Sequence, residues 1–248
     1  MKNIGAIILA AGKGKRLNMI NQNKVVLRLA DKPMIQHIMD FMKKIKIKTV
    51  VVVVGFAKET VTDALRNYDV IYAEQSEPLG TGHALVCGLA KLPDNIEDVL
   101  VVYGDDAVLY AEKHIATIKR LFEVQQSENA AITFLTIEQK NPNALGRILR
   151  DDKGKVNGIV EEKDATDMQR KITEINPGCF EFSVKFLKKY KSELKKSPVT
   201  NEFYINNFLD LAMKHGELVR TIQGGEMAWR GVNTIEELSE AKRLISLS

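Results

Sequence analysis

The chain begins with an apolar segment that ends abruptly in a loop of glycines and cations. Residues 4–11 read IGAIILAA, and residues 12–16 follow as GKGKR. The apolar segment has no polar helical face, which predicts a central strand covered on both sides. Glycines let backbone N–H groups approach an anion closely, and the cations add charge. The segment therefore predicts a buried strand that leads into a phosphate-binding loop.

The spacing of this loop excludes two common nucleotide-binding motifs. Gly14 is followed by Lys15 and Arg16, so the Gly-Lys-Ser/Thr ending of a P-loop is absent, and no third glycine completes a dinucleotide fingerprint. A simpler interpretation stays open here, because glycine and lysine after a strand are also typical of a solvated turn.

The first half of the chain alternates segments typical of strands with segments typical of helices. Further strands are predicted at 50–54, 70–73, 99–103 and 130–137, and helices at 33–44, 58–67, 82–92 and 111–127. Such alternation predicts a Rossmann-like α/β fold, in which a mostly parallel mixed sheet is flanked by helices. Ligands of such sheets gather at the carboxyl ends of the strands.

The second half has a different pattern. Two strands, 146–150 and 156–160, flank the turn signal DDKG, another strand ends near 178–182, and helices are predicted at 184–195, 202–213 and from 234 onward. No Pro/Ser-rich linker or charge block divides the 248 residues. We therefore expect one α/β domain with a smaller β-rich insertion.

Charge and cysteine content narrow the function classes. The formal net charge is +4, and the lysines are spread along the chain, which suits anionic small substrates at least as well as nucleic acid. Cys87 and Cys179 fit neither a disulfide framework nor a Cys-rich zinc site, so a cytoplasmic location is expected. No apolar run approaches the ~20 residues that span a membrane.

Two further strand ends carry polar groups. After the strand at 70–73, Gln75 precedes the turn Gly80-Thr81-Gly82, and a glutamine amide can both donate to and accept from a pyrimidine. After the strand at 99–103, Asp105 and Asp106 are placed to hold a hard divalent cation, and strand alternation predicts that only one of them faces it. We expect this to be Asp105, which directly follows the glycine. A helix cap or a turn is the alternative at both places.

Seven segments, in order along the chain, resemble the sugar-phosphate nucleotidyltransferases. They are residues 9–16 (LAAGKGKR), 75–84 with LGTGHA, 103–105 (YGD), 141–148 (NPNALGRI), 158–166 (GIVEEKDAT) with 174–176, 202–205 (EFYI) and 231–233 (GVN). The likeness is greatest to the pyrophosphorylase domain that makes UDP-N-acetylglucosamine. It implies the nucleotide-diphospho-sugar transferase fold, with a nucleotide-binding part at 1–137, a sugar-binding part at 138–233 and a C-terminal helix at 234–248.

The resemblance implies a role for individual residues. Gln75 and Gly80-Thr81 would read uracil, and Gly12, Lys13, Arg16 and Lys24 would lie along the triphosphate. The full nucleotide-binding set would be Leu9, Ala10, Ala11, Gly12, Lys13, Gly14, Arg16, Lys24, Gln75, Gly80, Thr81 and Tyr103. The sugar-phosphate set would be Gly104, Gly146, Glu161, Lys163, Asn176, Tyr204 and Asn206.

The resemblance also implies a magnesium site and a catalytic set. Asp105 and Asn233 would be the protein ligands of Mg²⁺, which usually takes only one or two protein oxygens and completes its shell with waters and phosphates. Arg16, Lys24 and Asp105 would be catalytic. Read without the resemblance, Asn233 could simply cap the following helix, and Asn176-Pro177-Gly178 could be a turn.

Four places depart from the family pattern. Asn23 stands where a proline usually precedes the phosphate-reaching lysine, and Asp106-Ala107 replaces an apolar-proline pair. Pro177 replaces a small hydroxyl residue, and Asn206-Asn207 replaces a Thr-Asp pair. These changes leave the residues expected at the triphosphate and the metal intact. They put the expected preference for an N-acetylated sugar in doubt.

The implied reaction joins UTP to N-acetylglucosamine 1-phosphate and releases pyrophosphate. The attacking phosphate oxygen is already ionised, so no side-chain base is needed, and alignment and charge neutralisation suffice. Glucose 1-phosphate or another phosphorylated acceptor is an alternative, as is a non-catalytic nucleotide-sugar-binding regulatory subunit. Acetyl transfer, nucleic acid binding and membrane insertion are not expected, and the oligomeric state is left open.

Overall fold

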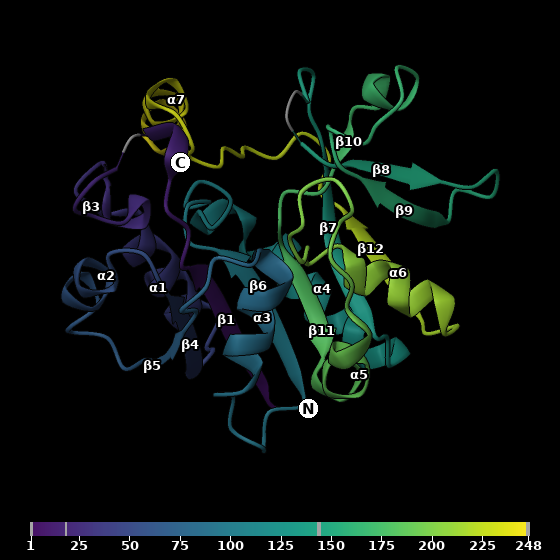
Figure 1. Ribbon diagram of the computed structural model, residues 1–248, viewed down its shortest axis with the longest axis horizontal. Coiled ribbons are helices and arrows are strands. Elements are labelled where there is room, and N and C mark those ends of the chain that lie inside the picture. Colours follow the sequence, from purple (N-terminus) through teal and green to yellow (C-terminus); the bar gives the residue numbers. More distant parts are fainter. Residues whose placement is uncertain (1, 18, 143–144, 247–248) are drawn as a thin grey trace.

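A single large sheet organises the computed structural model, which describes residues 2–17, 19–142 and 145–246 (Figure 1). Its strand order is β5-β4-β1-β6-β11-β7-β10-β8-β9, and β12 also pairs with β7. The strands of this sheet are β1 (Ile4–Ala10), β4 (Thr49–Val54), β5 (Ile71–Glu74), β6 (Asp98–Tyr103), β7 (Ile132–Glu138), β8 (Arg147–Arg150), β9 (Val156–Val160), β10 (Glu174–Ile175), β11 (Phe180–Ser183) and β12 (Val219–Gln223). A small separate hairpin is formed by β2 (Arg28–Leu29) and β3 (Lys32–Pro33).

The first long strands of the chain form a parallel part of the sheet. Strand β1 lies between β4 and β6 and is parallel to both, and β5 is parallel to β4. Strand β11 then runs antiparallel between β6 and β7. The predicted α/β fold with a mostly parallel mixed sheet flanked by helices is therefore confirmed. Its division at residues 137 and 233 stays a prediction.

Helices cover both faces of the sheet because β1 sends alternate residues to opposite sides. Ala6 and Ile8 pack in a core with α1 (Met34–Lys44), α2 (Lys58–Ala64) and α4 (Ile115–Glu128). Ile7 and Leu9 pack in a second core with α3 (Thr81–Leu89), α5 (Val184–Tyr190) and α6 (Asn207–Lys214). The uninterrupted apolar run at 4–11 is the consequence of burial on both faces.

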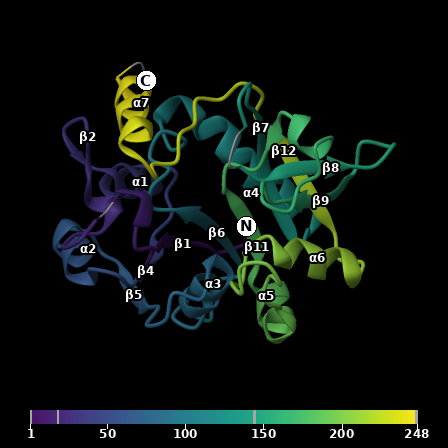
Figure 2. The same cartoon turned by 45° about the horizontal axis from the view of Figure 1, so that its top comes forward.

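The last described helix, α7 (Ile235–Ile245), returns to the N-terminal third of the chain. Figures 1 and 2 both show it beside the β2–β3 hairpin. Ala241 of α7 is buried with Leu29 of β2 and Val108 in a third apolar cluster. This contact places the residues just before α7 next to the loops that follow β1 and β6.

The predicted helix at 202–213 is wrong in its first five residues. Helix α6 begins only at Asn207, and residues 202–204 have no helical structure. Their backbone is used in long-range pairing: Phe203 N–H donates to the carbonyl of Leu79, and Gly82 N–H donates to the carbonyl of Phe203. Tertiary hydrogen bonds to the start of α3 thus override the local helical pattern.

Other helices are also shorter than predicted: α2 ends at Ala64 where the prediction ran to 67, and α3 ends at Leu89 where it ran to 92. The segment predicted as a helix at 184–195 becomes α5, which ends at Tyr190, followed by a 3₁₀ turn at Lys191–Glu193. The segment predicted at 111–127 begins with a 3₁₀ turn, Glu112–His114, before α4. Strand β12 was not among the predicted elements.

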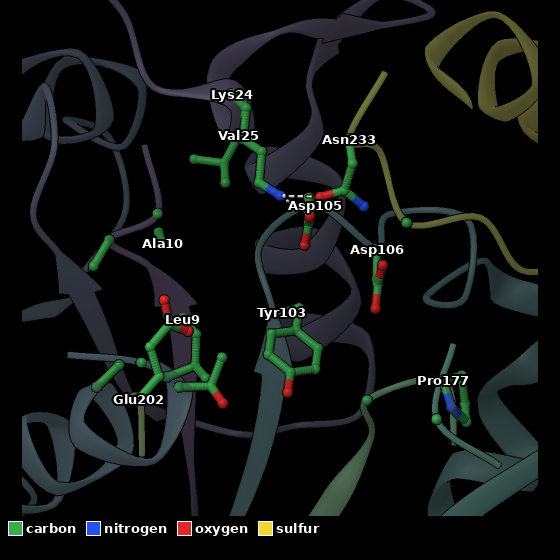
Figure 3. Close-up of a pocket in the computed structure, with 18 of the residues that line it drawn as sticks. Leu9, Ala10, Lys24, Val25, Tyr103, Asp105, Asp106, Pro177, Glu202 and Asn233 are labelled. Atoms are coloured by element: carbon green, nitrogen blue, oxygen red, sulfur yellow. Dashed lines mark hydrogen bonds and ion pairs between the residues drawn. The ribbon is translucent and has the colours of Figure 1, made fainter. Parts of the chain in front are cut away.

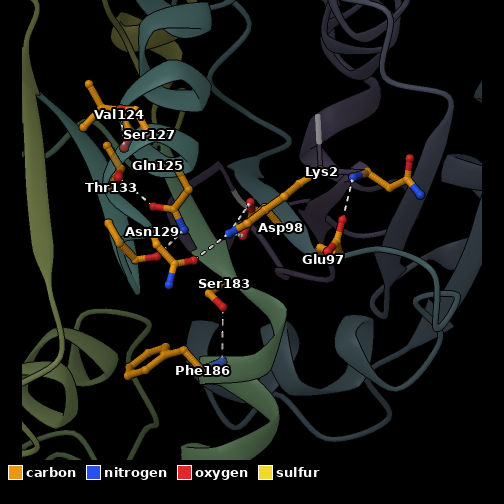
Figure 4. Close-up of polar contacts among 12 residues, drawn as sticks. Lys2, Glu97, Asp98, Val124, Gln125, Ser127, Asn129, Thr133, Ser183 and Phe186 are labelled. Carbon is orange, nitrogen blue, oxygen red and sulfur yellow. Dashed lines mark hydrogen bonds and ion pairs between the residues drawn. The ribbon is translucent and has the colours of Figure 1, made fainter.

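A partly buried polar cluster lies at the amino end of β6 (Figure 4). Lys2 Nζ lies 3.3 Å from Asp98 Oδ2 and donates to Asn129 Oδ1 at 3.1 Å. Thr133 donates to Gln125 Oε1 at 2.6 Å, and Gln125 donates to the carbonyl of Ala130 at 2.8 Å. This cluster ties α4 to the end of the sheet from which the parallel strands start.

Among the described residues, no helix is both long enough and apolar enough to cross a lipid bilayer.

Candidate active site

A cavity of about 540 Å³ opens where the parallel strands end (Figure 3). Register explains its position, because Leu9 pairs with Tyr103, Ala10 with Val54, and Val54 with Glu74. The loops after β1, β5 and β6 therefore leave the sheet side by side, as expected for the carboxyl edge of a parallel sheet. The cavity wall is completed by segments from the second half of the chain, around residues 145, 161, 176, 206 and 230.

Most residues singled out in the sequence line this one cavity. They are Leu9, Ala10, Ala11, Gly12, Lys13, Lys24, Gln75, Gly80, Thr81, Tyr103, Asp105, Gly146, Glu161, Asn176, Asn206 and Asn233. Five others do not line it: Gly14, Arg16, Gly104, Lys163 and Tyr204. Arg16 and Lys163 are solvent-exposed, and the Tyr204 hydroxyl donates to Thr200 Oγ1 at 2.7 Å. The roles assigned to these five, and to the residues that do line the cavity, stay predictions.

The glycine-rich loop leaves β1 with open space beside it. A Cβ on Gly12 would meet nothing within 4 Å, whereas Gly14 adopts φ +59°, which favours glycine. Lys13 lines the cavity, and its ammonium group lies 5.6 Å from the centre of the Phe56 ring. The loop therefore offers an open backbone and a cation at the end of the strand.

Asn23 connects this loop to its surroundings. Its side chain is fully buried, and Nδ2 donates its two hydrogens to the carbonyls of Ala10 at 2.9 Å and Phe56 at 2.8 Å, while the Gly12 carbonyl at 3.3 Å shares one of them. Its Oδ1 accepts from Val25 N–H at 3.2 Å. Its backbone has φ −76°, a value that proline also adopts. The departure from the family's proline therefore preserves the backbone and adds a side-chain connection between the loop and Lys24.

Lys24, Asp105 and Asn233 converge inside the cavity (Figure 3). The Lys24 ammonium donates to Asp105 Oδ2 and, at 2.8 Å, to Asn233 Oδ1. The side chains of Lys24 and Asp105 are only 15% and 12% exposed, so this ion pair is shielded from solvent. A carboxylate oxygen and an amide oxygen thus meet at one cation.

Helix α7 fixes the backbone that carries Asn233. Thr234 is its N-cap, and its hydroxyl accepts from Glu237 N–H at 3.2 Å. Glu237 Oε2 accepts from Asn233 N–H at 2.7 Å and from Thr234 N–H at 3.1 Å. The simple alternative that Asn233 is the cap is therefore wrong, since Thr234 and Glu237 form a capping box and leave the Asn233 side chain free to face Lys24.

The two oxygens fit a magnesium ion by their chemistry. Carboxylate and amide oxygens are hard ligands, and Mg²⁺ binds with one or two of them plus waters and phosphates. Within the described residues, three or more His, Cys, Asp or Glu side chains do not cluster as a closed metal site. Asp105 and Asn233 therefore suit an open magnesium site, in which phosphates and waters supply the remaining ligands.

Asp106 points away from this pair and is almost completely buried. Burial, followed by the neighbouring Asp105 carboxylate, raises the pKa of Asp106 well above its ordinary value. Its Oδ1 would lie 2.6 Å from a Cβ placed on Gly231, and so the glycine at 231 makes room for this carboxyl group. Of the two aspartates, only Asp105 contacts Lys24.

Gln75 and the turn before α3 form another wall. Gln75 Nε2 donates to the Gly80 carbonyl at 2.9 Å and lies 3.1 Å from His83 Nδ1. Gly80 has φ +103°, and a Cβ there would lie 2.4 Å from the Phe203 carbonyl oxygen. Thr81 Oγ1 accepts from Ile205 N–H at 3.0 Å. Glycine is required at 80 because the chain at 203–205 packs directly on the turn.

The far wall contains a chain of amide and carboxyl groups. Asn206 Nδ2 donates to Glu161 Oε1 at 2.7 Å, and Asn176 Nδ2 donates to Asn206 Oδ1 at 3.3 Å. Asn176 Oδ1 accepts from Gly178 N–H at 2.8 Å, which is the turn suggested by Asn176-Pro177-Gly178. Burial raises the pKa of Glu161. Asn206 thus joins residues from two distant segments.

Sequence reasoning missed several lining residues. They are Val25, Pro78, Ala84, Asp106, Leu145, Pro177, Gly178, Glu202, Trp229 and Gly231. Trp229 is the one tryptophan of the chain, and its indole N–H donates to the Pro177 carbonyl at 3.2 Å. A lone tryptophan two residues before the Gly-Val-Asn motif was the available signal.

The family model described as "Nucleotidyl transferase" matches residues 5–246. The chain belongs to the nucleotidyl transferase family. It is 37% identical over 243 residues to the bifunctional protein GlmU of Caldicellulosiruptor saccharolyticus, and that match covers 97% of this chain and 51% of the relative. It is 35% identical over 238 residues to bifunctional GlmU of Psychrobacter sp., covering 96% and 50%. The predicted family is thereby confirmed, and its members are enzymes.

A solved structure supports the fold. A putative glucose-1-phosphate thymidylyltransferase from Bacillus anthracis, solved in complex with a sucrose, superposes with a TM-score of 0.80 at 21% identity, covering 98% of this chain and 95% of that one. The chain spans about half the length of the curated relatives it matches.

Proposed function

We propose that this nucleotidyltransferase transfers a uridylyl group from UTP to N-acetylglucosamine 1-phosphate and releases pyrophosphate. The observation that carries the proposal is the shared cavity: the loop at Gly12 and Lys13, the amide of Gln75, the Lys24–Asp105–Asn233 group and the wall at Glu161 and Asn206 all face one volume. Relatives named bifunctional GlmU, which this chain matches at 35–37% identity, support the same activity.

The groups of the cavity have complementary tasks in this proposal. The loop after β1 binds the triphosphate through backbone N–H groups and Lys13. Gln75 faces the base, and Glu161 and Asn206 face the sugar. In this proposal, the α-phosphorus lies near Lys24 and Asp105, between the two ends of the cavity.

Catalysis in this site needs alignment and charge neutralisation. The sugar phosphate already carries an ionised oxygen that attacks the α-phosphorus in line with the leaving pyrophosphate, so no general base is required. The Lys24 ammonium donates to Asp105 Oδ2 and Asn233 Oδ1, the two oxygens proposed to bind the metal. From this position it supplies positive charge to the phosphates. A bound Mg²⁺, held by Asp105 and Asn233, would neutralise further charge on the phosphate oxygens.

Glucose 1-phosphate is the second candidate acceptor, and Asn206 is the residue that favours it. The Asn206 side chain, which is longer than the family's threonine, already forms hydrogen bonds with Glu161 Oε1 and Asn176 Nδ2. Two polar groups of the sugar wall are therefore engaged by the protein itself. The structural neighbour's name, a glucose-1-phosphate thymidylyltransferase, is in keeping with this alternative.

The test measures pyrophosphate release with Mg²⁺ across UTP, dTTP, CTP and GTP, each with N-acetylglucosamine 1-phosphate and glucose 1-phosphate. We expect the highest kcat/KM with UTP and the N-acetylated sugar. Faster turnover of glucose 1-phosphate would overturn the acceptor. Absence of turnover with every pair, in protein shown to be folded, would favour a non-catalytic nucleotide-sugar-binding subunit.

A further inference from the structure

The side-chain amide of Gln75 has both of its N–H groups engaged by the protein. Gln75 lines the cavity and is 8% exposed. Nε2 donates one hydrogen to the Gly80 carbonyl at 2.9 Å, and its second partner is His83 Nδ1 at 3.1 Å. An amide nitrogen has only two hydrogens to donate. In the described part of the chain, Oε1 receives no hydrogen bond from the protein, and it is the atom left for a ligand.

The backbone determines which way the amide faces. The Gly80 carbonyl can only accept, so the amide nitrogen must lie against it, since a flipped amide would bring two carbonyl oxygens together. Gly80 itself cannot shift easily, because its φ is +103° and the Phe203 backbone fills the space that a Cβ at Gly80 would take. The orientation of Gln75 is thus fixed from one side by a rigid turn.

His83 fixes the amide from the other side through one tautomer. Its Nδ1 faces an amide donor and must therefore accept, which places the ring proton on Nε2. Nε2 faces the Cys87 sulfur at 3.8 Å, one turn further along α3. His83 is only partly buried and does not line the cavity, so it contacts Gln75 without facing a ligand.

We propose that His83 is a positioning residue that makes Gln75 an acceptor-only reader of the base. An amide with both hydrogens engaged selects a base that presents an N–H donor at its pairing edge. Uracil and thymine present N3–H, whereas cytosine presents an unprotonated, accepting N3 at the same ring position. His83 therefore contributes to selection of UTP over CTP. This inference rests on the proposed function and specifies how its base is chosen.

The experiment compares His83→Leu with His83→Asn in otherwise intact protein. Leucine removes the acceptor, so the amide gains a free hydrogen, while asparagine can place Oδ1 near the position of Nδ1. Equilibrium binding of UTP and CTP is measured calorimetrically with Mg²⁺, and pyrophosphate release is measured in parallel. We expect the CTP-to-UTP Kd ratio to fall at least ~fivefold in His83→Leu and to stay near the native value in His83→Asn.

A purely structural role for His83 would weaken both nucleotides alike and leave the ratio unchanged, which would overturn the inference. Native protein that releases pyrophosphate equally well from UTP and CTP would also overturn it, yet nucleotidyl transfer would stand. Native protein that releases none from any nucleotide would instead contradict the proposed function.

A second measurement does not depend on any variant. Long-range ¹H–¹⁵N NMR spectra of the native protein report the tautomer of each histidine. We expect His83 as the Nε2–H tautomer, with Nδ1 unprotonated. A proton on Nδ1 would overturn the inference, because Nδ1 could not then accept from Gln75.

Discussion

The ammonium group of Lys24 donates a 2.8 Å hydrogen bond to the side-chain oxygen of Asn233, 209 residues further along the chain. The same ammonium binds Asp105, so a cation from the start of the chain joins a carboxylate after β6 and an amide before α7. The two oxygens proposed to hold a metal are therefore both engaged by a protein cation. Metal binding and the position of Lys24 should depend on each other.

Replacing Lys24 by methionine should tighten metal binding while it lowers turnover. The variant keeps much of the side-chain volume but removes the positive charge that competes for Asp105 and Asn233. We expect Mn²⁺, followed by electron paramagnetic resonance as a probe, to bind nucleotide-free protein about tenfold more tightly, which is ~1.4 kcal/mol. Lys13→Met is the matched control, because Lys13 lines the cavity without contacting either oxygen. Equal Mn²⁺ affinities in both variants would contradict the expectation.

Asp105→Asn should lower kcat by at least ~10²-fold, because a neutral amide weakens metal-assisted stabilisation of charge on the phosphates. Steady-state pyrophosphate release measures the effect, and circular dichroism verifies the fold. Asp94→Asn makes the same chemical change on a side chain that is 99% exposed, and its turnover should stay native. Unchanged kcat in Asp105→Asn would remove Asp105 from the catalytic set.

Asn23→Asp should destabilise the loop after β1. The carboxylate keeps the acceptor for Val25 N–H but cannot donate to the carbonyls of Ala10, Gly12 and Phe56, so one buried and two partly buried acceptors lose this donor. We expect the free energy of unfolding to fall by ~2 kcal/mol or more in urea titrations, and KM for UTP to rise. Asn21→Asp adds the same charge at an exposed position and should change neither quantity. Native stability in Asn23→Asp would mean that the side-chain hydrogen bonds contribute little.

Glu181→Gln should change the pH dependence of stability. Glu181 is fully buried in β11, both carboxyl oxygens lack hydrogen-bond partners among the described residues, and burial, followed by Asp98, raises its pKa to about 9. A raised folded-state pKa means that the contribution of Glu181 to stability is complete below its ordinary pKa of 4.5 and is lost as pH rises through 9.

Glutamine stays neutral, so the variant should become more stable than the native protein as pH rises. Between pH 6 and 9, the difference in unfolding free energy should grow by roughly 1 kcal/mol per pH unit in urea titrations. Glu123→Gln, at an exposed position in α4, should give a pH profile parallel to the native one. A parallel profile for Glu181→Gln would show that Glu181 is ionised in the folded protein.

Local patterns in the sequence were sufficient for the parallel half of the fold. The apolar run at 4–11 predicted a strand buried on both faces, and alternating residues Ile7 and Ile8 do enter opposite cores. The ends of the strands at Ala11, Gln75 and Asp105 could be placed together, because parallel strands in register deliver their carboxyl ends to one edge.

Tertiary structure decided what local patterns do not encode. Residues 202–204 resemble a helix locally but are not helical, because the Phe203 backbone pairs with Leu79 and Gly82. Strand alternation predicted that only Asp105 faces the site, but not that Lys24 would be its partner or that Asp106 would be buried beside Gly231. Whether Gln75 donates or accepts depends on His83 and the Gly80 carbonyl.

Sequence and tertiary structure decided different features because the interactions involved act over different distances along the chain. Periodic burial and glycine conformations act over a few residues, so the sequence by itself determined the strand–loop order and the residue types of the site. Hydrogen-bond saturation and ion pairing join groups that are far apart in sequence, such as Lys24 with Asn233 and Asn206 with Glu161. Only the folded chain determined which polar atoms remain free to meet a ligand.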